Sequence, residues 1–252
     1  MRAFLLAAGE GRRLRPLTDA LPKCLVPVQG TPLLGIWLRL LERHGVTRVL
    51  VNLHHFHEQV TGFLREFPTT LAVETVYEPR LLGSAGTVLA NRRFVEGADP
   101  FLVLYADNLT AVDLGAMVAF HRGRTEALTL GVVPTDRPRE KGTVVLGAGG
   151  EVLAFEEKAA EPRTNLANAG IYVASHAIFD AMPREVPADQ LLDFGFDVLP
   201  RLVPRIAAFP IDQFLMDIGT PDAYARAQAI WPGLTARTVP VDTGLGADHG
   251  PS

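Results

Sequence analysis

Residues 5–18 read LLAAGEGRRLRPLT, and Pro22-Lys23 follows three residues later. An apolar run from Ala3 to Leu6 predicts a buried first strand that ends shortly before Gly9 and Gly11. Because glycine has no Cβ, the backbone can turn tightly there and a ligand can approach it closely. Backbone N–H groups with arginines and a lysine behind them suit a polyphosphate. A tight strand-to-helix turn with solvated arginines explains the two glycines equally well.

The complete string is more specific than its two glycines. It lacks the Gly-Lys-Ser/Thr of a Walker loop and the third glycine of the dinucleotide-binding fingerprint. It closely resembles the signature of the sugar-1-phosphate nucleotidyltransferases (nucleotide-sugar pyrophosphorylases), in which Gly-x-Gly-x-Arg-Leu-x-Pro-Leu-Thr leads to Pro-Lys. The resemblance implies that Gly9 and Gly11, with Leu6 and Ala8 beside them, contact a nucleoside triphosphate.

Length and composition narrow the class of protein. At 252 residues with 48% hydrophobic side chains, the chain can form one large α/β domain or two small ones. The net charge of −4 gives no reason to expect a nucleic-acid partner. We see no signal peptide and no run of roughly 20 apolar residues, so we expect a cytoplasmic protein without a membrane partner. The single cysteine, Cys24, is expected to be a packed side chain rather than a reactive thiol.

Strands alternate with helical patterns through the first half of the chain, which predicts βαβ units and a mainly parallel sheet. The strands are expected at 3–6, 46–53, 71–77, 101–105 and 127–133. Helices are expected at 31–41, 58–66, 85–92 and 114–122. The first of them is expected to begin with Thr31 as the cap and Pro32 in the first turn. From residue 142 on, the pattern predicts strands at 142–146, 151–155, 169–174 and 205–209, with helices at 191–202 and 223–230.

These elements predict an α/β fold of the Rossmann-like (GT-A-like) type. Its mixed, mainly parallel sheet would be flanked by helices and joined by a smaller antiparallel part that binds the sugar. We expect a catalytic domain over 1–231 and a loosely ordered tail over 232–252, which is rich in Gly, Pro, Thr and Asp. We see no repeated hexapeptide tail, so we expect a lone catalytic domain. A homodimer is a working assumption, because nothing in the sequence decides the oligomeric state.

Two aspartates are candidates for a metal site. Asp107 follows the apolar run 101–105, and ligands of open α/β sheets bind at the carboxyl ends of strands. Asp217 lies in Met216–Pro221, which resembles the family's Asp-x-Gly-Thr-Pro segment. Each aspartate could instead cap a helix or a turn. The resemblance implies that both hold Mg²⁺, which prefers carboxylates, phosphate oxygens and water, although Ala106 stands where the family usually has glycine.

Sugar-binding candidates follow the predicted strands of the second half. Glu156-Glu157-Lys158 is either a solvated charged rim or the family's Glu-Lys element, with Ala159 in place of the usual proline. By the resemblance, Lys158 holds the sugar phosphate and Glu157 accepts sugar hydroxyls. Asn168 has the donors and the acceptor that sugar recognition needs, although a turn residue is its alternative reading. The expected sugar-phosphate contacts are Asn108, Gly142, Glu157, Lys158 and Asn168.

Leu82–Thr87 is the remaining glycine element, and its glycines let a flat group pack against the backbone. In the family this segment lies against the nucleobase, which implies contacts from Gly83, Ser84 and Gly86. Its form is most similar to enzymes that use GTP to make GDP-mannose or GDP-manno-heptose. The histidines of the run 54–57 lack the spacing and the acidic partner of a metal site. We therefore expect His54, His55 and His57 in a loop between a strand and a helix.

The resemblance predicts an enzyme that joins an NTP to a sugar 1-phosphate and releases pyrophosphate, with GTP and a mannose or manno-heptose phosphate favoured. Arg13 would neutralise the β- and γ-phosphates, and Lys23 would bridge the α-phosphate and the incoming phosphate. The expected catalytic residues are Arg13, Lys23, Asp107, Lys158 and Asp217. Two alternatives stay open: UTP or dTTP with a glucose-type or N-acetylated sugar 1-phosphate, and a non-catalytic homologue that binds nucleotide sugars as a regulator.

Overall fold

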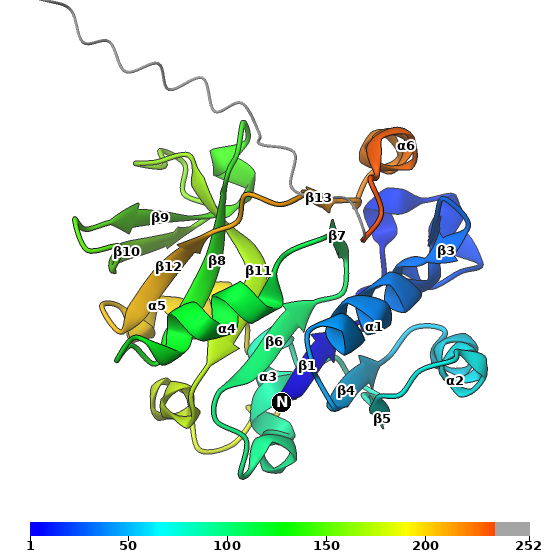
Figure 1. The fold of residues 1–252 in the computed structure, drawn as a ribbon, viewed down its shortest axis with the longest axis horizontal. Helices are drawn as coiled ribbons and strands as arrows, with labels where there is room; N and C mark the ends of the chain where they lie inside the picture. Colours follow the sequence, from blue (N-terminus) through cyan, green and yellow to red (C-terminus); the bar gives the residue numbers. More distant parts are fainter. Residues whose placement is uncertain (235–252) are drawn as a thin grey trace, which may run out of the picture.

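The computed structural model describes residues 1–234, which form a nine-stranded sheet with helices packed against it (Figure 1). The strands of this sheet are β1 (Arg2–Leu6), β4 (Arg48–Leu53), β5 (Ala72–Tyr77), β6 (Phe101–Tyr105), β8 (Leu128–Pro134), β9 (Gly142–Leu146), β10 (Val152–Glu157), β11 (Leu166–Ala174) and β12 (Ile206–Pro210). They follow the order β10-β9-β11-β6-β1-β4-β5, with β8 paired to both β11 and β12.

The sheet consists of a parallel half and a mostly antiparallel half. Strands β1, β4, β5 and β6 run parallel to one another, as the alternation of strands and helices predicts. Strand β11 runs antiparallel to β6 and β8, and β9 and β10 form an antiparallel pair. The expected fold class, a mixed α/β sheet with an antiparallel part, is confirmed.

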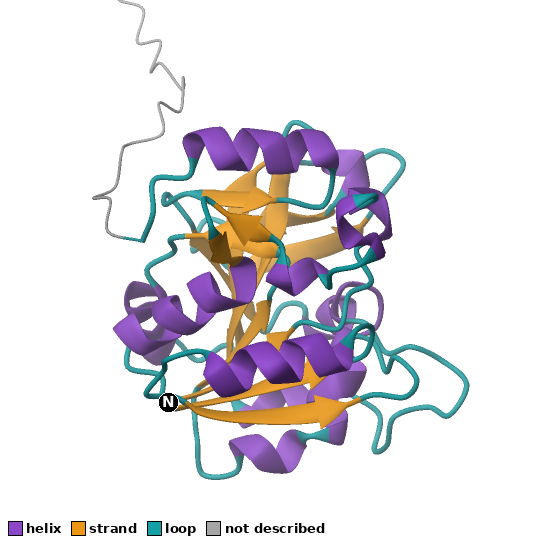
Figure 2. Ribbon diagram, turned by 90° about the vertical axis from the view of Figure 1, so that its right-hand side faces the viewer, coloured by secondary structure: helices purple, strands orange, loops and turns teal. Residues whose placement is uncertain are grey.

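Helices cover both faces of the sheet, as the side view in Figure 2 shows. They are α1 (Leu33–Arg43), α2 (His57–Glu66), α3 (Ser84–Ala90), α4 (Leu114–Arg122), α5 (Leu199–Leu202) and α6 (Pro221–Ile230). On β1, Ala3 and Leu5 pack with Trp37 of α1, whereas Phe4 points to the opposite face and packs with Val88 of α3. Both faces are therefore buried, which explains why this strand is apolar from Ala3 to Leu6 rather than alternating.

The first helix begins later than predicted. Thr31-Pro32 forms β3 (Thr31–Pro32), which pairs with β2 (Pro27–Val28), and α1 starts at Leu33 without a side-chain cap. The expected capping by Thr31 is wrong because this residue pairs with Val28 in a small hairpin. Gln29 and Gly30 connect the two strands with positive φ values of 47° and 82°, the backbone of a tight two-residue hairpin turn.

The helix predicted over 191–202 is also shorter than expected. A π-helical turn covers Phe194–Val198 and α5 follows it, whereas Leu192 lies in a connection outside any helix or strand. The backbone of Leu192 pairs with another element: its N–H donates to Leu82 O, and its carbonyl accepts from Ala85 N and Gly86 N. These bonds at the start of α3 replace the helical bonds that the sequence pattern suggests.

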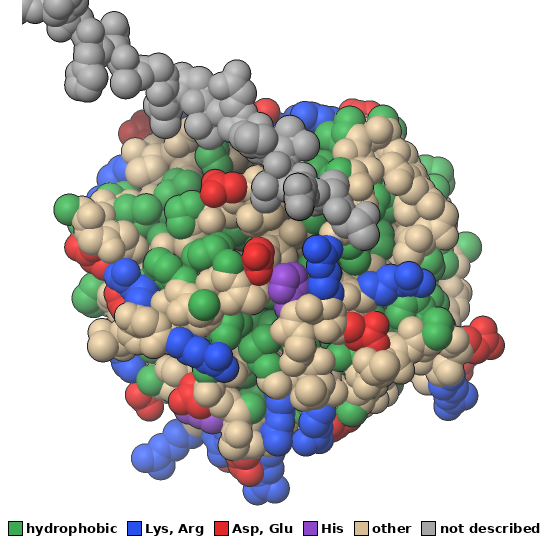
Figure 3. Space-filling model, in the orientation of Figure 1, with side chains coloured by type: hydrophobic (Ala, Val, Ile, Leu, Met, Phe, Trp, Pro, Cys, Tyr) green, Lys and Arg blue, Asp and Glu red, His purple; other side chains and the backbone are tan. Residues whose placement is uncertain are grey.

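Other elements agree closely with the sequence pattern. Strand β6, strand β9 and helix α4 begin and end at the predicted residues. Within residues 1–234 no helix is both long and apolar enough to cross a membrane. On the face in Figure 3, basic side chains are interspersed with acidic ones. The tail predicted over 232–252 lies, from residue 235 on, outside the described part of the chain.

Candidate active site

The glycine loop after β1 supports a lysine. Gly11 has a positive φ of 66°, and a Cβ there would lie 2.9 Å from both Lys23 Cβ and Thr18 Cγ2. Thr18 Oγ1 donates to Gly11 O at 2.8 Å, which ties the loop to the short helical turns that follow. Only glycine fits this backbone and this space, so the loop and Lys23 are packed as one unit. At Gly9, by contrast, a Cβ would meet nothing within 4 Å.

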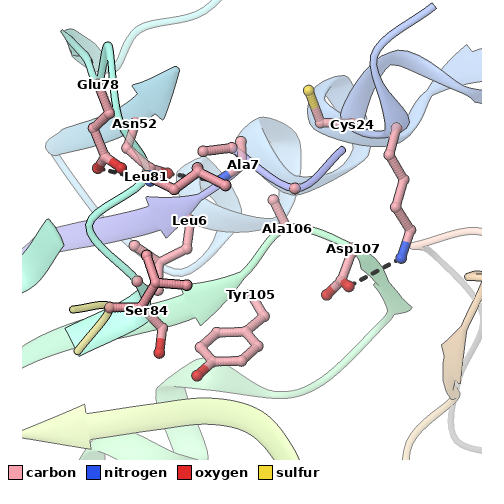
Figure 4. A pocket seen from close by; sticks show the side chains of 15 residues that line it. Leu6, Ala7, Cys24, Asn52, Glu78, Leu81, Ser84, Tyr105, Ala106 and Asp107 are labelled. Atoms are coloured by element: carbon pink, nitrogen blue, oxygen red, sulfur yellow. Dashed lines mark hydrogen bonds and ion pairs between the residues drawn. The ribbon is translucent and has the colours of Figure 1, made fainter. Parts of the chain in front are cut away.

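The loop borders a cavity of about 230 Å³ at the carboxyl ends of the parallel strands, which we call the apolar cavity (Figure 4). In Figure 4, Glu78 and Ser84 lie toward one end of this cavity and Asp107 toward the other. Five residues expected at a nucleotide line it, together with a leucine from the second half of the chain: Leu6, Ala8, Gly9, Gly83, Ser84 and Leu191. Two other residues expected at the nucleotide do not line this cavity. Gly86 is buried with its N–H bonded to Leu192 O, and Gly11 packs against Lys23, which does line the cavity.

A buried polar network backs the apolar cavity, and sequence reasoning did not single it out. Asn52 Oδ1 accepts from Ala7 N at 2.8 Å, and Asn52 Nδ2 donates to Glu78 Oε1 at 3.0 Å. The hydroxyl of Thr87 donates to the same Glu78 oxygen at 2.5 Å, and Leu82 N donates to Glu78 Oε2 at 3.1 Å. The network joins the ends of β1 and β5 to β4 and α3. An asparagine inside the apolar run of β4 was its signal in the sequence.

Two short strands bring the predicted aspartates together. Strand β7 (Asn108–Thr110) pairs antiparallel with β13 (Leu215–Asp217), and Asp217 lies opposite Asn108 in the register. Asp107 immediately precedes β7, so both carboxylates reach the same ammonium group. Lys23 Nζ lies 2.9 Å from Asp107 Oδ2 and 3.7 Å from Asp217 Oδ1. The lysine side chain is only 7% exposed, which places a buried cation between the two acids.

Further cations surround Asp217. Lys141 Nζ donates to Asp217 Oδ2 at 2.9 Å, and Arg13 Nη2 lies 3.9 Å from the same oxygen. Burial by itself raises the pKa of Asp217, but attraction from Lys141, Lys23 and Arg13 and the hydrogen bond from Lys141 outweigh it. The pKa of Asp217 therefore lies below its ordinary value. Lys141 was not among the residues expected from the sequence, where it reads as one more charge on a polar loop.

A second, larger cavity of about 690 Å³ adjoins the first, and we call it the polar cavity. Tyr105 and Asp107 line both cavities, so Asp107 lies where the two meet. The polar cavity gathers all the expected sugar-phosphate residues and one expected at the triphosphate: Arg13, Asn108, Gly142, Glu157, Lys158 and Asn168. Asn108 is the most constrained of them, because its amide donates to Ala169 O at 2.9 Å and its side chain is buried.

Glycines make room for Glu157 beside this cavity. A Cβ on Gly142 or Gly195 would lie 2.4 or 2.5 Å from Glu157 Oε2, closer than any real contact. Burial raises the pKa of Glu157, and the neighbouring carboxylate of Asp193 adds to the rise although Lys158 and Lys141 oppose it. Lys158 has a left-handed backbone, with a φ of 49°, which is uncommon for a residue with a Cβ. This backbone directs its ammonium group to within 5.7 Å of the ring centre of Phe196.

The cysteine and two of the three histidines lie where the sequence analysis expects them. Cys24 is buried, and burial raises the pKa of its thiol to about 12, so it is a packed side chain rather than a nucleophile. His54 and His55 lie in the loop between β4 and α2, as expected, whereas the loop predicted for His57 is wrong because this residue begins α2. Among residues 1–234 no group of three or more His, Cys, Asp and Glu side chains is close enough to hold a metal. Two carboxylates without a third protein ligand do fit Mg²⁺, which keeps water and substrate phosphates as its remaining ligands.

The family model for nucleotidyl transferases matches residues 2–231 of the chain. A UTP–glucose-1-phosphate uridylyltransferase from Synechocystis is 32% identical over 90% of this chain and 62% of its own length. A mannose-1-phosphate guanylyltransferase from Mycobacterium tuberculosis is 31% identical over 90% of this chain and 63% of its own length. A D-glycero-alpha-D-manno-heptose 1-phosphate guanylyltransferase from Aneurinibacillus thermoaerophilus is 29% identical over 90% of this chain and 97% of its own length. The chain thus spans less than two thirds of the first two relatives.

The fold is shared with solved structures as well. The crystal structure of HddC from Yersinia pseudotuberculosis complexed with GMP-PN has a TM-score of 0.74 and 25% identity, over 91% of this chain and 99% of that chain. The sequence match runs from the first strand to the residue after α6, and it contains every strand and helix that borders the two cavities. The chain belongs to the nucleotidyl transferase family.

Proposed function

We propose that this protein joins a nucleoside triphosphate to a sugar 1-phosphate, giving a nucleotide sugar and pyrophosphate. The observation that carries the proposal is the buried ammonium of Lys23 between Asp107 and Asp217, at the meeting point of the two cavities. A nucleoside would occupy the apolar cavity and a sugar the polar cavity. Their two phosphates would then meet at the residues where charge has to be neutralised.

The reaction is an in-line displacement. An oxygen of the sugar 1-phosphate forms a bond to the α-phosphorus, and the bond from that phosphorus to the oxygen bridging to the β-phosphate breaks. Pyrophosphate leaves with the electron pair of that bond. No general base is needed, because the attacking phosphate is already an anion at pH 7. Positioning and charge neutralisation by the protein therefore account for catalysis.

The position of each residue suggests its role in the reaction. Backbone N–H groups of the Gly9–Gly11 loop would hold triphosphate oxygens, and Lys23 would bridge the α-phosphate and the attacking phosphate. Arg13 would neutralise the leaving pyrophosphate, and Lys158 would hold the sugar phosphate. Asp107 and Asp217 would hold Mg²⁺, which neutralises phosphate charge and supplies Lewis-acid stabilisation when it is bound.

GTP is the favoured nucleotide in this proposal. Glu78 lines the apolar cavity with an acceptor-only carboxylate, and its Oε2 accepts a backbone hydrogen bond from Leu82. Guanine presents two adjacent donors, N1–H and the 2-amino group, which match a carboxylate. Uracil and thymine present one N–H between two carbonyl oxygens, which a carboxylate repels. The names of the mycobacterial and Aneurinibacillus relatives, and the HddC complex with GMP-PN, support a mannose-type or heptose-type sugar with GTP.

A second candidate keeps the reaction and changes the substrates to UTP or dTTP with a glucose-type sugar 1-phosphate. The Synechocystis relative, named as a uridylyltransferase, favours it. A pyrophosphate-release screen of five NTPs against mannose, manno-heptose, glucose and N-acetylglucosamine 1-phosphates decides between the two, with and without excess EDTA. We expect the highest kcat/KM with GTP and turnover only when Mg²⁺ is present. Tight binding of nucleotide sugars without turnover on any pair would instead identify a non-catalytic homologue.

A further inference from the structure

Lys141 lines the polar cavity and contacts Asp217, and the proposed mechanism has not used its charge. It lies directly before β9, and its side chain is 37% exposed, compared with 7% for Lys23. Lys141 lines the polar cavity, whereas Lys23 lines the apolar cavity. The two lysines contact different oxygens of Asp217, Lys23 at Oδ1 and Lys141 at Oδ2.

The backbone links Lys141 to the residue proposed to hold the sugar phosphate. Lys158 N donates to Lys141 O at 3.1 Å, directly beyond the pairing of Glu157 with Gly142 in the β10–β9 ladder. Two ammonium groups therefore enter the polar cavity from adjacent strands. Lys158 has a left-handed backbone, and its ammonium group lies over the ring of Phe196. The ammonium group of Lys141 instead donates to the carboxylate of Asp217.

The charge of Lys141 can be neutralised by a second anion besides Asp217. A divalent cation bound at Asp217 would neutralise the carboxylate that Lys141 contacts. An ammonium group left without that anion, and already facing the polar cavity, would bind the next anion to enter it. In the proposed reaction that anion is the phosphate of the sugar, which must approach a triphosphate that repels it. A second lysine at this point reduces the repulsion between the two phosphates.

We propose that Lys141 is a substrate-binding residue that contacts the phosphate of the sugar 1-phosphate, acting together with Lys158. This inference rests on the proposed function. It predicts that removing the Lys141 charge weakens binding of the sugar 1-phosphate and leaves binding of the nucleotide nearly unchanged. If Lys141 served only to hold Asp217 in place, its removal would have the opposite effect. The dependence of activity on Mg²⁺ and on the nucleotide would change, and the KM for the sugar 1-phosphate would not.

The test compares Lys141→Met, Lys141→Arg and the control Arg137→Met, which removes a charge from the same loop. Arg137 is 67% exposed and its ion-pair partner is Glu140 rather than Asp217. Each variant is assayed for pyrophosphate release with the substrate pair that the wild type uses best, at saturating Mg²⁺. We expect Lys141→Met to raise the KM for the sugar 1-phosphate about ten- to a hundred-fold, as loss of a charge-assisted hydrogen bond would. The KM for the NTP should stay within about two-fold, Lys141→Arg should restore most of the loss, and Arg137→Met should match the wild type.

A binding measurement makes the test independent of turnover. Mannose 1-phosphate is titrated calorimetrically into the wild type and each variant, with Mg²⁺ and a GTP analogue whose α,β-bridging oxygen is replaced so that it cannot react, and melting temperatures check that the variants fold. The same weakening in Lys141→Met supports the inference. An unchanged sugar-phosphate KM and affinity, or a change confined to Mg²⁺ or NTP dependence, overturns it. A wild type that releases no pyrophosphate with any pair would instead contradict the proposed function, while the calorimetric comparison would still judge Lys141.

Discussion

The two halves of the sheet build two different cavities. In the parallel half, β1, β4, β5 and β6 are joined through helices, and their carboxyl ends border the apolar cavity. In the mostly antiparallel half, β8, β9, β10 and β11 border a larger cavity lined by charged side chains. Consecutive parallel strands place their ends at one edge of a sheet, so a nucleotide site can be built there from short local motifs. An antiparallel sheet has no such edge, and its polar cavity draws residues from segments far apart in the chain.

The candidate chemistry lies at the seam between these halves. The β7–β13 pair joins residue 108 to residue 217, and it places Asp217 within reach of Lys23 from the first half and Lys141 from the second. Leu192 forms a second link, because its backbone bonds to both sides of Gly83 at the start of α3. Variants at the seam should therefore affect turnover or folding more than variants within one half, and the following experiments test that expectation.

The largest effect is expected at Lys23. Lys23→Met should lower kcat by about 10²- to 10³-fold, because a preorganised cation at the reacting phosphates is lost. Pyrophosphate release at saturating substrates measures the loss of kcat. The melting temperature should stay close to that of the wild type. Lys158→Met, within the second half, should act mainly on the KM of the sugar 1-phosphate. A Lys23 variant with near wild-type kcat would show that the seam is not the reaction centre.

Glu78 tests what the parallel half contributes to specificity. Glu78→Gln should reduce kcat/KM for GTP relative to UTP by about ten- to a hundred-fold, because an amide offers a donor where guanine needs an acceptor. Competition between the two NTPs in one assay measures the ratio directly. With the amide oxygen kept toward Asn52, the NH2 group replaces the oxygen that accepts from Leu82 N, so that bond is lost. A thermal melt checks that the fold is kept. An unchanged ratio would remove Glu78 from base recognition.

Gly83 tests the backbone link between the halves. Its φ of 83° and ψ of 164° lie in a region that essentially only glycine adopts, and a Cβ would be 2.4 Å from Leu192 O. Gly83→Ala should therefore reduce the free energy of unfolding by about 1–3 kcal/mol. The matched control is Gly62→Ala inside α2, where a Cβ meets nothing within 4 Å and alanine should stabilise by about 0.5–1 kcal/mol. Urea unfolding of both variants checks the opposite signs, and equal effects would contradict the account.

Asp217 should show a smaller, pH-dependent effect. The folded protein favours its ionised form, so the stabilisation is present above the unfolded pKa of about 3.9 and is lost as the pH falls through the lower folded pKa. The difference in unfolding free energy between wild type and Asp217→Asn should be constant from pH 8 to 5 and then decrease below pH 4. Urea titrations in metal-free buffer measure it. A difference that grows as the pH falls would mean that Lys23 and Lys141 do not stabilise the carboxylate.

Several elements in both halves of the sheet could be predicted from local patterns. Strand β6 and helix α4 have the predicted bounds, because apolar runs and helical periodicity are local properties. The predictions failed where the backbone of a segment bonds outside the predicted helix. Thr31 pairs with Val28 instead of capping α1, and Leu192 bonds to α3 instead of extending a helix. The first pairing is a local hairpin that the Thr-Pro helix signal concealed, and the second could not be read from a local pattern because its partner lies more than 100 residues away.

The sequence by itself determined the family, the fold class and the candidate residues, because the Gly9–Lys23 motif and the strand periodicity are written in consecutive residues. Tertiary structure alone decided how these residues meet. It placed Lys141 against Asp217, put the Asn52–Glu78 pair behind the apolar cavity and assigned Arg13 to the polar cavity. The physical reason is that charge neutralisation and hydrogen bonding depend on distances across the sheet. Those distances are set by strand order and by the β7–β13 register, and neither can be read from residues adjacent in the chain.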